Sequence, residues 1–136
     1  MSVGSWKTGV GVNHVGAYQV SGRPFASASV VASSSIKVEF PKVTRWVQVH
    51  NRDPLGDCRV GFSENGVEGT ENNYFFIIQS PPAGGVQVGE VLELKIEEIW
   101  LSGSGIVDVV AGLTNIDTVK LSGSTGTNWS GSIGVG

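Results

Sequence analysis

The sequence predicts an all-β fold, an antiparallel β-sandwich of the jelly-roll kind with extended N- and C-terminal arms. Apolar and polar residues alternate with a period of two in several short runs, as they do in half-buried strands. Clusters of turn-forming residues separate these runs at intervals of roughly 8 to 12 residues, a spacing typical of sandwiches and barrels. No stretch of useful length shows the helical period. A jelly roll has eight strands in two sheets, and the runs described below supply about that number.

Composition divides the 136 residues into three zones. Residues 1–24 form an N-terminal arm rich in glycine and serine, in which Lys7 and Arg23 are the only charges. Residues 25–114 alternate short apolar runs with turn signals, and we interpret them as the sandwich domain. Residues 115–136 return to glycine, serine and threonine and form the C-terminal arm. A chain of this length is expected to hold a single domain.

Four strands are predicted in the first half of the sandwich. Residues 25–31 supply the first, and residues 35–40 supply a second in which isoleucine, valine and phenylalanine share one face. Pro41 then interrupts the pairing, because proline has no backbone N–H to donate. Residues 44–50 resume as a β-rich run with two valines on one face. Residues 59–62 form a short fourth strand.

Two further strands are predicted after a long surface loop at residues 63–73. Residues 73–78 are apolar on both faces, as a fully buried strand would be, and prolines and glycines break the chain after them. The next run alternates strictly and directs Leu92, Leu94 and Ile96 inward.

The closing strands carry one irregularity and one turn. At Glu97 and Glu98 the alternation slips by one position, which indicates a bulge or a corner between sheets. Residues 102–105, with two glycines and two serines, are predicted to form a hairpin turn. Residues 106–113 form the last strand.

Carboxylates are frequent in the loop region 53–71. Ca²⁺ takes six to eight oxygen ligands from flexible loops, so these side chains are a candidate calcium site, although their spacing matches no EF-hand. The alternative is a solvated acidic loop without a metal, which we adopt as the prediction. The side chains concerned are Asp53, Asp57, Glu64, Glu68 and Glu71.

The residue types needed for catalysis are scarce. His14 and His50 are the only histidines; His14 lies in the N-terminal arm and His50 ends a strand beside a polar loop. Cys58 has no histidine at a recognisable nucleophile spacing, and we interpret it as a small residue of the core. A hydrolase on a β-sandwich would need a triad or a metal set. The sequence therefore predicts no catalytic residues, no metal ligands, no cofactor and no enzymatic activity.

Charge and hydropathy exclude two classes of partner. The net charge of −3 and the isoelectric point of about 5.3 argue against nucleic acid, which requires a basic surface to neutralise phosphates. No apolar run reaches the roughly 20 residues that span a bilayer, so no membrane partner is expected. The N-terminal residues lack the basic start and apolar core of a secretory signal. A single cysteine is consistent with assembly in a reducing compartment.

The two arms are predicted to mediate assembly with other subunits. They have too little patterning to fold alone, so they either wrap back on their own sandwich or lie on neighbouring subunits. Large aromatic residues are favoured anchors at interfaces. The subunit-interface candidates are Trp6, Tyr18, Phe25 and Trp129. The low charged fraction of 15% also suits a surface packed against neighbours, and a homo-oligomer, a trimer or a pentamer, is expected.

Several segments resemble small structural proteins of the virions of aquatic viruses, both marine phages and large algal viruses. The resemblance covers nearly the whole chain, and its segments are NHVGAYQVSGRPFA (13–26), VEFPKVTRWVQVHN (38–51), RVGFSENGVEG (59–69), IWLSGSGIVDVVAGLTNI (99–116) and NWSGSIGVG (128–136). It implies a jelly-roll-like component of a virus particle without enzymatic activity. It brings no functional-site residues.

Two functions follow from the residues and the resemblance together. The first is a non-enzymatic structural component of the virion, such as a minor capsid, cement or decoration protein, that binds other capsid or virion proteins. The alternative is a glycan- or receptor-binding sandwich of a viral fibre or similar assembly. Its site would be built from Trp46, Trp100, Tyr74 or the acidic loop.

Overall fold

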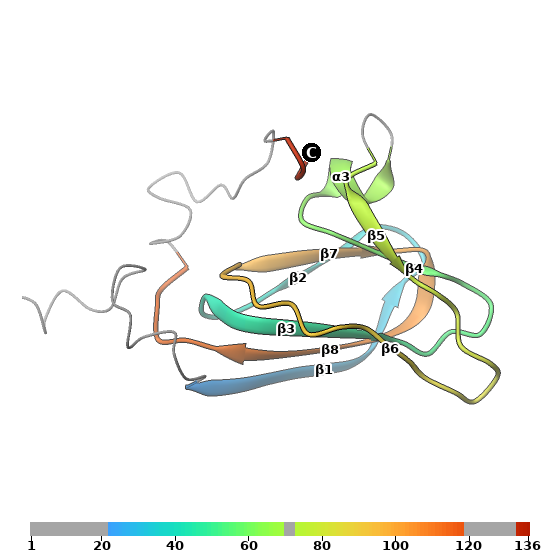
Figure 1. Ribbon diagram of the computed structural model, residues 1–136, viewed down its shortest axis with the longest axis horizontal. Coiled ribbons are helices and arrows are strands. Elements are labelled where there is room, and N and C mark those ends of the chain that lie inside the picture. Colours follow the sequence, from blue (N-terminus) through green and yellow to red (C-terminus); the bar gives the residue numbers. More distant parts are fainter. Residues whose placement is uncertain (1–21, 70–72, 119–132) are drawn as a thin grey trace, which may run out of the picture.

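The computed structural model describes residues 22–69, 73–118 and 133–136. Two four-stranded sheets lie face to face, and every strand pair is antiparallel (Figure 1). The strand order is β1-β8-β3-β6 in the first sheet and β2-β7-β4-β5 in the second. The predicted all-β antiparallel sandwich is therefore confirmed. The strands are β1 (Arg23–Ala32), β2 (Ile36–Glu39), β3 (Thr44–Asn51), β4 (Cys58–Gly61), β5 (Phe75–Ile78), β6 (Gln87–Val88), β7 (Glu98–Ser102) and β8 (Ser104–Leu113).

The core lies between the sheets and is built by the predicted alternation. In β3, Val47 and Val49 are buried while Gln48 between them is half-exposed. Val107 and Val109 of β8 follow the same pattern on the neighbouring strand. Cys58 at the start of β4 is fully buried, as the sequence predicts. Alternation works here because successive side chains of a strand point to opposite faces.

The chain changes sheet at the two places where the sequence pattern breaks. Around Pro41 it leaves β2 of the second sheet and enters β3 of the first. At the predicted slip, Ile96 and Ile99 are both buried with two glutamates between them. The Ile96 carbonyl accepts from the amide of Thr44 in β3, whereas the Glu97 carbonyl accepts from Phe40 next to β2. The slip is thus a corner between sheets.

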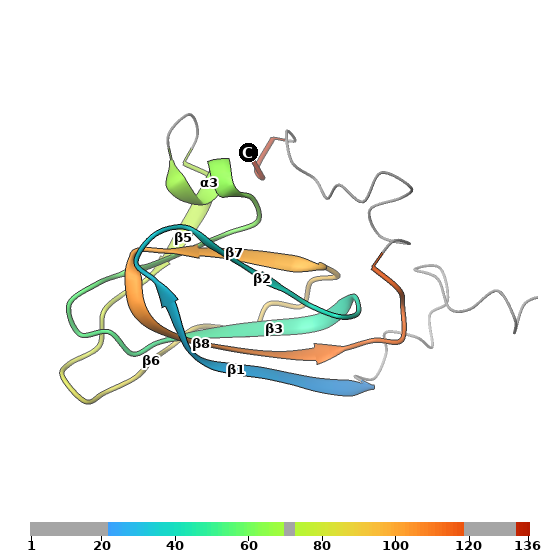
Figure 2. The same cartoon turned by 180° about the vertical axis from the view of Figure 1, so that it is seen from behind.

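The turn at residues 102–105 was expected to close a hairpin, and this prediction is wrong. Gly103 joins β7 to β8, but these two strands belong to different sheets and do not pair with each other. Gly103 has a φ of 91°, a conformation that side-chain-bearing residues rarely adopt. The turn is therefore a tight corner, which Figure 2 shows from behind.

Three other predictions are corrected. β5 is not fully buried: it is the edge strand of its sheet, and Ile77 is 52% exposed. The expected strand at 90–96 is reduced to an isolated bridge between Leu92 and Val47, and Leu94, which was expected to point inward, is 37% exposed. The loop predicted at 63–73 contains a short helix, α3 (Glu64–Glu68). Ser63 caps this helix by accepting from the Gly66 amide. The helix is too short to show an apolar period, so the sequence pattern did not predict it.

The sandwich reaches slightly beyond its predicted bounds. The Gly22 amide donates to the Leu113 carbonyl at 2.8 Å. Ile116 is fully buried, and its carbonyl accepts from the Val43 amide at 3.0 Å. The first residues of the predicted C-terminal arm therefore pack on the sandwich. Among the described residues, no helix has the length and apolar character needed to cross a membrane.

Candidate interaction surface

Of the four predicted interface residues, the structure describes one. Trp6, Tyr18 and Trp129 lie outside the described residues. Phe25 is half-buried in β1, and its ring meets the ring of Phe40 edge-on at a centroid distance of 5.1 Å. Phe25 therefore contributes to the packing of its own sandwich, and its role between subunits stays a prediction.

The sandwich is open along one side, between β5 and β6. Each of these strands ends the order of its sheet, so no further strand covers it in the described part of the chain. An apolar groove of about 490 Å³ runs between the two edges. Residues from both sheets line it, among them Phe76, Ile78, Val88 and Leu92.

Strand register explains why β5 exposes apolar side chains on both of its faces. Phe76 lies opposite Val60, which is fully buried, so Phe76 faces the interior between the sheets. It is nevertheless 39% exposed, because the interior opens to solvent at this edge. Ile77 lies opposite Arg59 and faces outward. An edge strand of this composition normally carries charged side chains that prevent further strand pairing, or it is covered by a neighbouring element.

The exposed apolar residues of the segment 76–94, from which all the groove-lining residues come, form what we call the open-edge surface. It comprises six of the ten large hydrophobic residues exposed in the described part of the chain. Its members are Phe76, Ile77, Val86, Val88, Val91 and Leu94. The residues that line the groove include one charged side chain, Glu90. Gathered apolar side chains of this kind mark surfaces that bind another protein or a similar apolar partner.

Buried polar contacts hold the two edges of the groove in place. The Gly89 amide donates to the Val49 carbonyl at 2.9 Å, and Gln48 Nε2 donates to the Gly89 carbonyl at the same distance. A Cβ atom on Gly89 would lie 2.5 Å from the Val49 carbonyl oxygen, so a side chain there would push the edge outward. On the other edge, Asn51 Nδ2 lies 3.1 Å from the Ile78 carbonyl oxygen. The groove is thus preformed.

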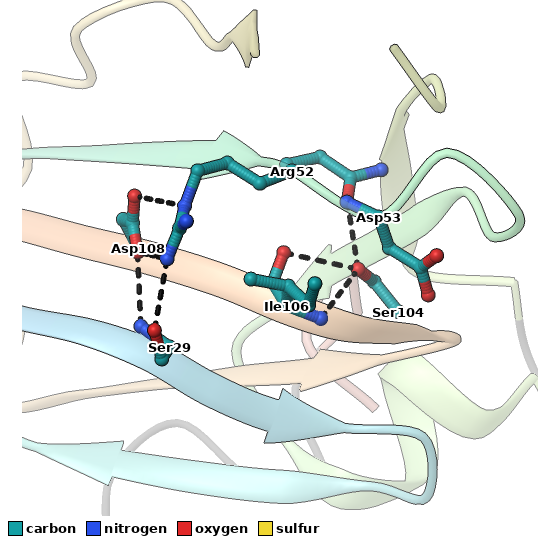
Figure 3. A network of polar contacts seen from close by, with 7 residues as sticks. Ser29, Arg52, Asp53, Ser104, Ile106 and Asp108 are labelled. Carbon is teal, nitrogen blue, oxygen red and sulfur yellow. Dashed lines mark hydrogen bonds and ion pairs between the residues drawn. The ribbon is translucent and has the colours of Figure 1, made fainter. Parts of the chain in front are cut away.

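A polar cluster lies on the outer face of the first sheet (Figure 3). Arg52 Nε lies 2.7 Å from Asp108 Oδ2, and Arg52 Nη2 donates to Ser29 Oγ at 2.9 Å. Asp108 Oδ1 accepts from the Ser29 amide, which holds Ser29 at a φ of 57° within an irregularity of β1. Burial would raise the pKa of Asp108, but the hydrogen bonds from Arg52 and Ser29 outweigh it, and the pKa is lowered. These contacts tie β1, β8 and the end of β3 together.

His50 and Cys58, whose side-chain types are often catalytic, both lie in strands of the sandwich. His50 is half-buried in β3 opposite Asp108, and its Nε2 has no hydrogen-bond partner among the described residues. Burial raises the pKa of the Cys58 thiol to about 12, against a smaller opposing effect of the Ser102 backbone. Cys58 is therefore a protonated core residue at neutral pH.

Three carboxylates of the acidic loop region accept hydrogen bonds from other parts of the described chain. Asp53 accepts from the amides of Gly105 and Leu55, and these two hydrogen bonds lower its pKa. Asp57 accepts from the Ser80 amide at 2.8 Å. Glu68 accepts from Ser35 Oγ, also at 2.8 Å, whereas Glu71 lies outside the described residues. Residues 22–69, 73–118 and 133–136 contain no group of three or more side chains placed to hold a metal ion.

The aromatic residues considered for glycan binding do not form one platform. Trp46 lies on β3 of the first sheet and Trp100 on β7 of the second, and both are half-buried. Trp100 Nε1 donates to Glu98 at 2.7 Å, and Lys37 Nζ lies 6.0 Å from the ring centroid. Tyr74, just before β5, is half-buried as well.

Sequence reasoning missed the open-edge surface because it assigned β5 to the interior. A usable signal lay in the residues that follow this strand. Pro81 and Pro82 cannot donate to a sheet ladder, and a short apolar strand that runs into prolines is typical of a sheet edge.

Comparisons with known proteins provide no relative of this chain. No protein-family model, no curated protein and no solved structure matches this chain.

Proposed function

We propose that the chain is a non-enzymatic structural subunit that packs against neighbouring subunits through the open-edge surface. The observation that carries this proposal is the preformed apolar groove between two uncovered edge strands. Exposed apolar groups and unpaired strand edges are both unfavourable in a free monomer. A partner that covers them removes both costs at once.

Strand pairing supports a jelly-roll classification of the sandwich. β1 pairs with β8, β2 with β7 and β3 with β6, and β4 and β5 form the hairpin at the centre of this series. The chain thus has the connectivity of one long hairpin that is rolled up. Rolling brings β3 beside β8 and β4 beside β7, the remaining two pairs. Jelly rolls of eight strands are used by viral capsid proteins, lectin domains and cupins.

We further infer that the setting is a virus particle, with a role as a minor capsid, cement or decoration protein. The support comes from the resemblance of the five sequence segments, the jelly-roll pairing and the low fraction of charged residues. The partners would be other virion proteins and further copies of this chain, in a trimer or a pentamer.

The experiment that tests the interface changes one residue of the open-edge surface. In Ile77→Lys, a charge on the outer face of β5 should block close packing but leave the fold intact, because Ile77 is outside the core. Light scattering after gel filtration should show an oligomer for the unchanged protein and a monomer for the variant. Circular dichroism should give the same β spectrum for both.

Leu55→Lys is the matched control. Leu55 is an exposed apolar residue in the loop after β3, outside the open-edge surface, so this variant should keep the mass of the unchanged protein. The proposal would be contradicted if the unchanged protein and Ile77→Lys were both monomeric and neither of them bound a virion component. In that case a glycan array would be the next measurement.

A further inference from the structure

The last described residues dock on the short helix α3, as both views of the fold show (Figures 1 and 2). Ser63 Oγ lies 2.6 Å from the Val135 carbonyl oxygen and 2.8 Å from the main-chain oxygen of Gly136. Ser63 is almost fully buried and also accepts from the Gly66 amide, which fixes the position of its hydroxyl group. These contacts depend on the backbone of the docked segment.

The docking site requires glycine, which has no side chain, both on the helix and on the docked segment. A Cβ atom on Gly66 would lie 2.2 Å from the Val135 carbonyl oxygen. A Cβ atom on Gly136 would lie 2.7 Å from the Gly66 nitrogen. We call this site, formed by Ser63 and Gly66, the α3 slot. It admits the docked segment, which forms a turn at residues 133–135, because glycine permits close approach of the two backbones.

Docking within one chain leaves apolar groups uncovered. Ile133 is 94% exposed, although Val135 and Gly136 further along the segment contact the slot. An apolar hollow of about 280 Å³ lies beside the docked segment, lined by Phe62, Leu94 and Ile96 among others. Leu94 also belongs to the open-edge surface, so the hollow beside the docked segment shares one residue with that surface.

The length of the connecting segment permits docking on another molecule. Residues 119–132 join the sandwich to the docked segment, and fourteen residues span up to about 50 Å when extended. A domain of this size has a radius of gyration of about 14 Å. The segment can therefore reach the slot of a subunit that touches the open-edge surface.

We propose that the α3 slot is a peptide-binding site, and that in the assembled protein it takes residues 133–136 of a second copy. Every backbone contact made within one chain is available in identical form between two chains, which is the condition for exchange of an element between copies. Exchange also brings Ile133 to the interface, where the neighbouring subunit can cover it. This inference rests on the proposed function, because it requires assembly.

The test labels the slot and the docked segment of the full-length protein. Asn65→Cys places an exposed thiol beside the slot, and Ile133→Cys places another on the segment. The native Cys58 is fully buried and does not compete. The double variant is prepared with and without ¹⁵N, and the two preparations are dissociated, mixed, reassembled and joined by a short bismaleimide. Exchange between copies predicts that about half of the 65–133 cross-links carry mixed isotopes.

Two glycine variants of the docked segment provide the matched pair. Gly136→Ala places its Cβ against Gly66 and should lower cross-linking about tenfold. Gly134→Ala is the control: Gly134 also has a positive φ, but a Cβ there meets nothing within 4 Å. Both changes lie outside the sandwich core, so the fold should survive in each.

The outcomes separate this inference from the proposed function. Cross-links with a single isotope only, in a protein that is oligomeric by mass, would overturn the exchange and leave the open-edge interface standing. An equal loss of cross-linking in both glycine variants would overturn the role of the slot. A failure of the proposed function shows separately, as a monomer whose mass does not respond to Ile77→Lys.

Discussion

Asn51 organises three parts of the chain through one buried side chain. Its Nδ2 lies within 3.2 Å of the carbonyl oxygens of Gly56, Ile78 and Gln79. Its Oδ1 accepts from Ser104 Oγ at 2.7 Å. We expect Asn51→Ala to lower the free energy of unfolding by about 3 kcal/mol, because several buried polar groups lose their partner. Urea denaturation followed by tryptophan fluorescence measures this loss.

Asn65→Ala is the control for this prediction. Asn65 is exposed in α3, and surface substitutions of this kind change stability by no more than about 0.5 kcal/mol. Equal losses in the two variants would show that Asn51 does not hold these loops. A loss confined to Asn51 would confirm that the groove edge at Ile78 is held by it.

Asp108 makes stability depend on pH in a defined direction. Its pKa in the folded protein is lowered below the ordinary value of 3.8, so the stability that it contributes is present above that value and is lost as pH falls through the folded pKa. We expect Asp108→Asn to be less stable by about 1 kcal/mol at neutral pH, a modest figure because the pair with Arg52 is partly exposed. Denaturation at a series of pH values should show this difference vanish in acid. A constant difference would contradict the ion-pair explanation.

At the scale of elements, the corner between β7 and β8 depends on one glycine. A Cβ atom on Gly103 would lie 2.7 Å from the Asp57 carbonyl oxygen, and its φ of 91° is unfavourable for alanine. We expect Gly103→Ala to cost about 3 kcal/mol, from strain and collision together. Thermal or urea unfolding gives the value.

Gly84→Ala separates the two causes. Gly84 also has a positive φ, of 77°, but a Cβ there meets nothing within 4 Å. This variant should lose only about 1 kcal/mol, the cost of the left-handed backbone. Similar losses at both glycines would mean that the approach of Asp57 is relaxed easily and that the corner is not tightly packed.

At the scale of the whole molecule, Cys58 reports on opening of the sandwich. Burial raises the pKa of its thiol to about 12, so the reactive thiolate is scarce, and the residue is fully buried. We expect an aromatic disulfide reagent to react at least about 10³ times more slowly with the folded protein than with the chain in urea, since reaction requires global opening. Equal rates would show that the sheets separate readily near β4.

The distribution of surfaces over the molecule agrees with an assembling subunit. The outer face of the second sheet carries charged pairs such as Lys37 with Glu39. Apolar exposure instead gathers along the edge between β5 and β6, and the hollow beside the docked segment shares Leu94 with it. One side of the sandwich is thus suited to solvent and another to contact with neighbours.

The sequence by itself determined most of the strands and the alternating part of the core, because both follow from local rules; it missed β6 and overextended the run at 90–96. Alternation placed Val47 and Val49 inside, and Pro41 and the slip at Glu97 marked the changes of sheet. Only the tertiary structure decided which strands became edges. The exposure of β5 and the corner at Gly103 depend on which strands lie beyond them, and these come from distant parts of the chain. Local periodicity carries no information about such long-range pairing, so the open-edge surface and the α3 slot required the folded molecule.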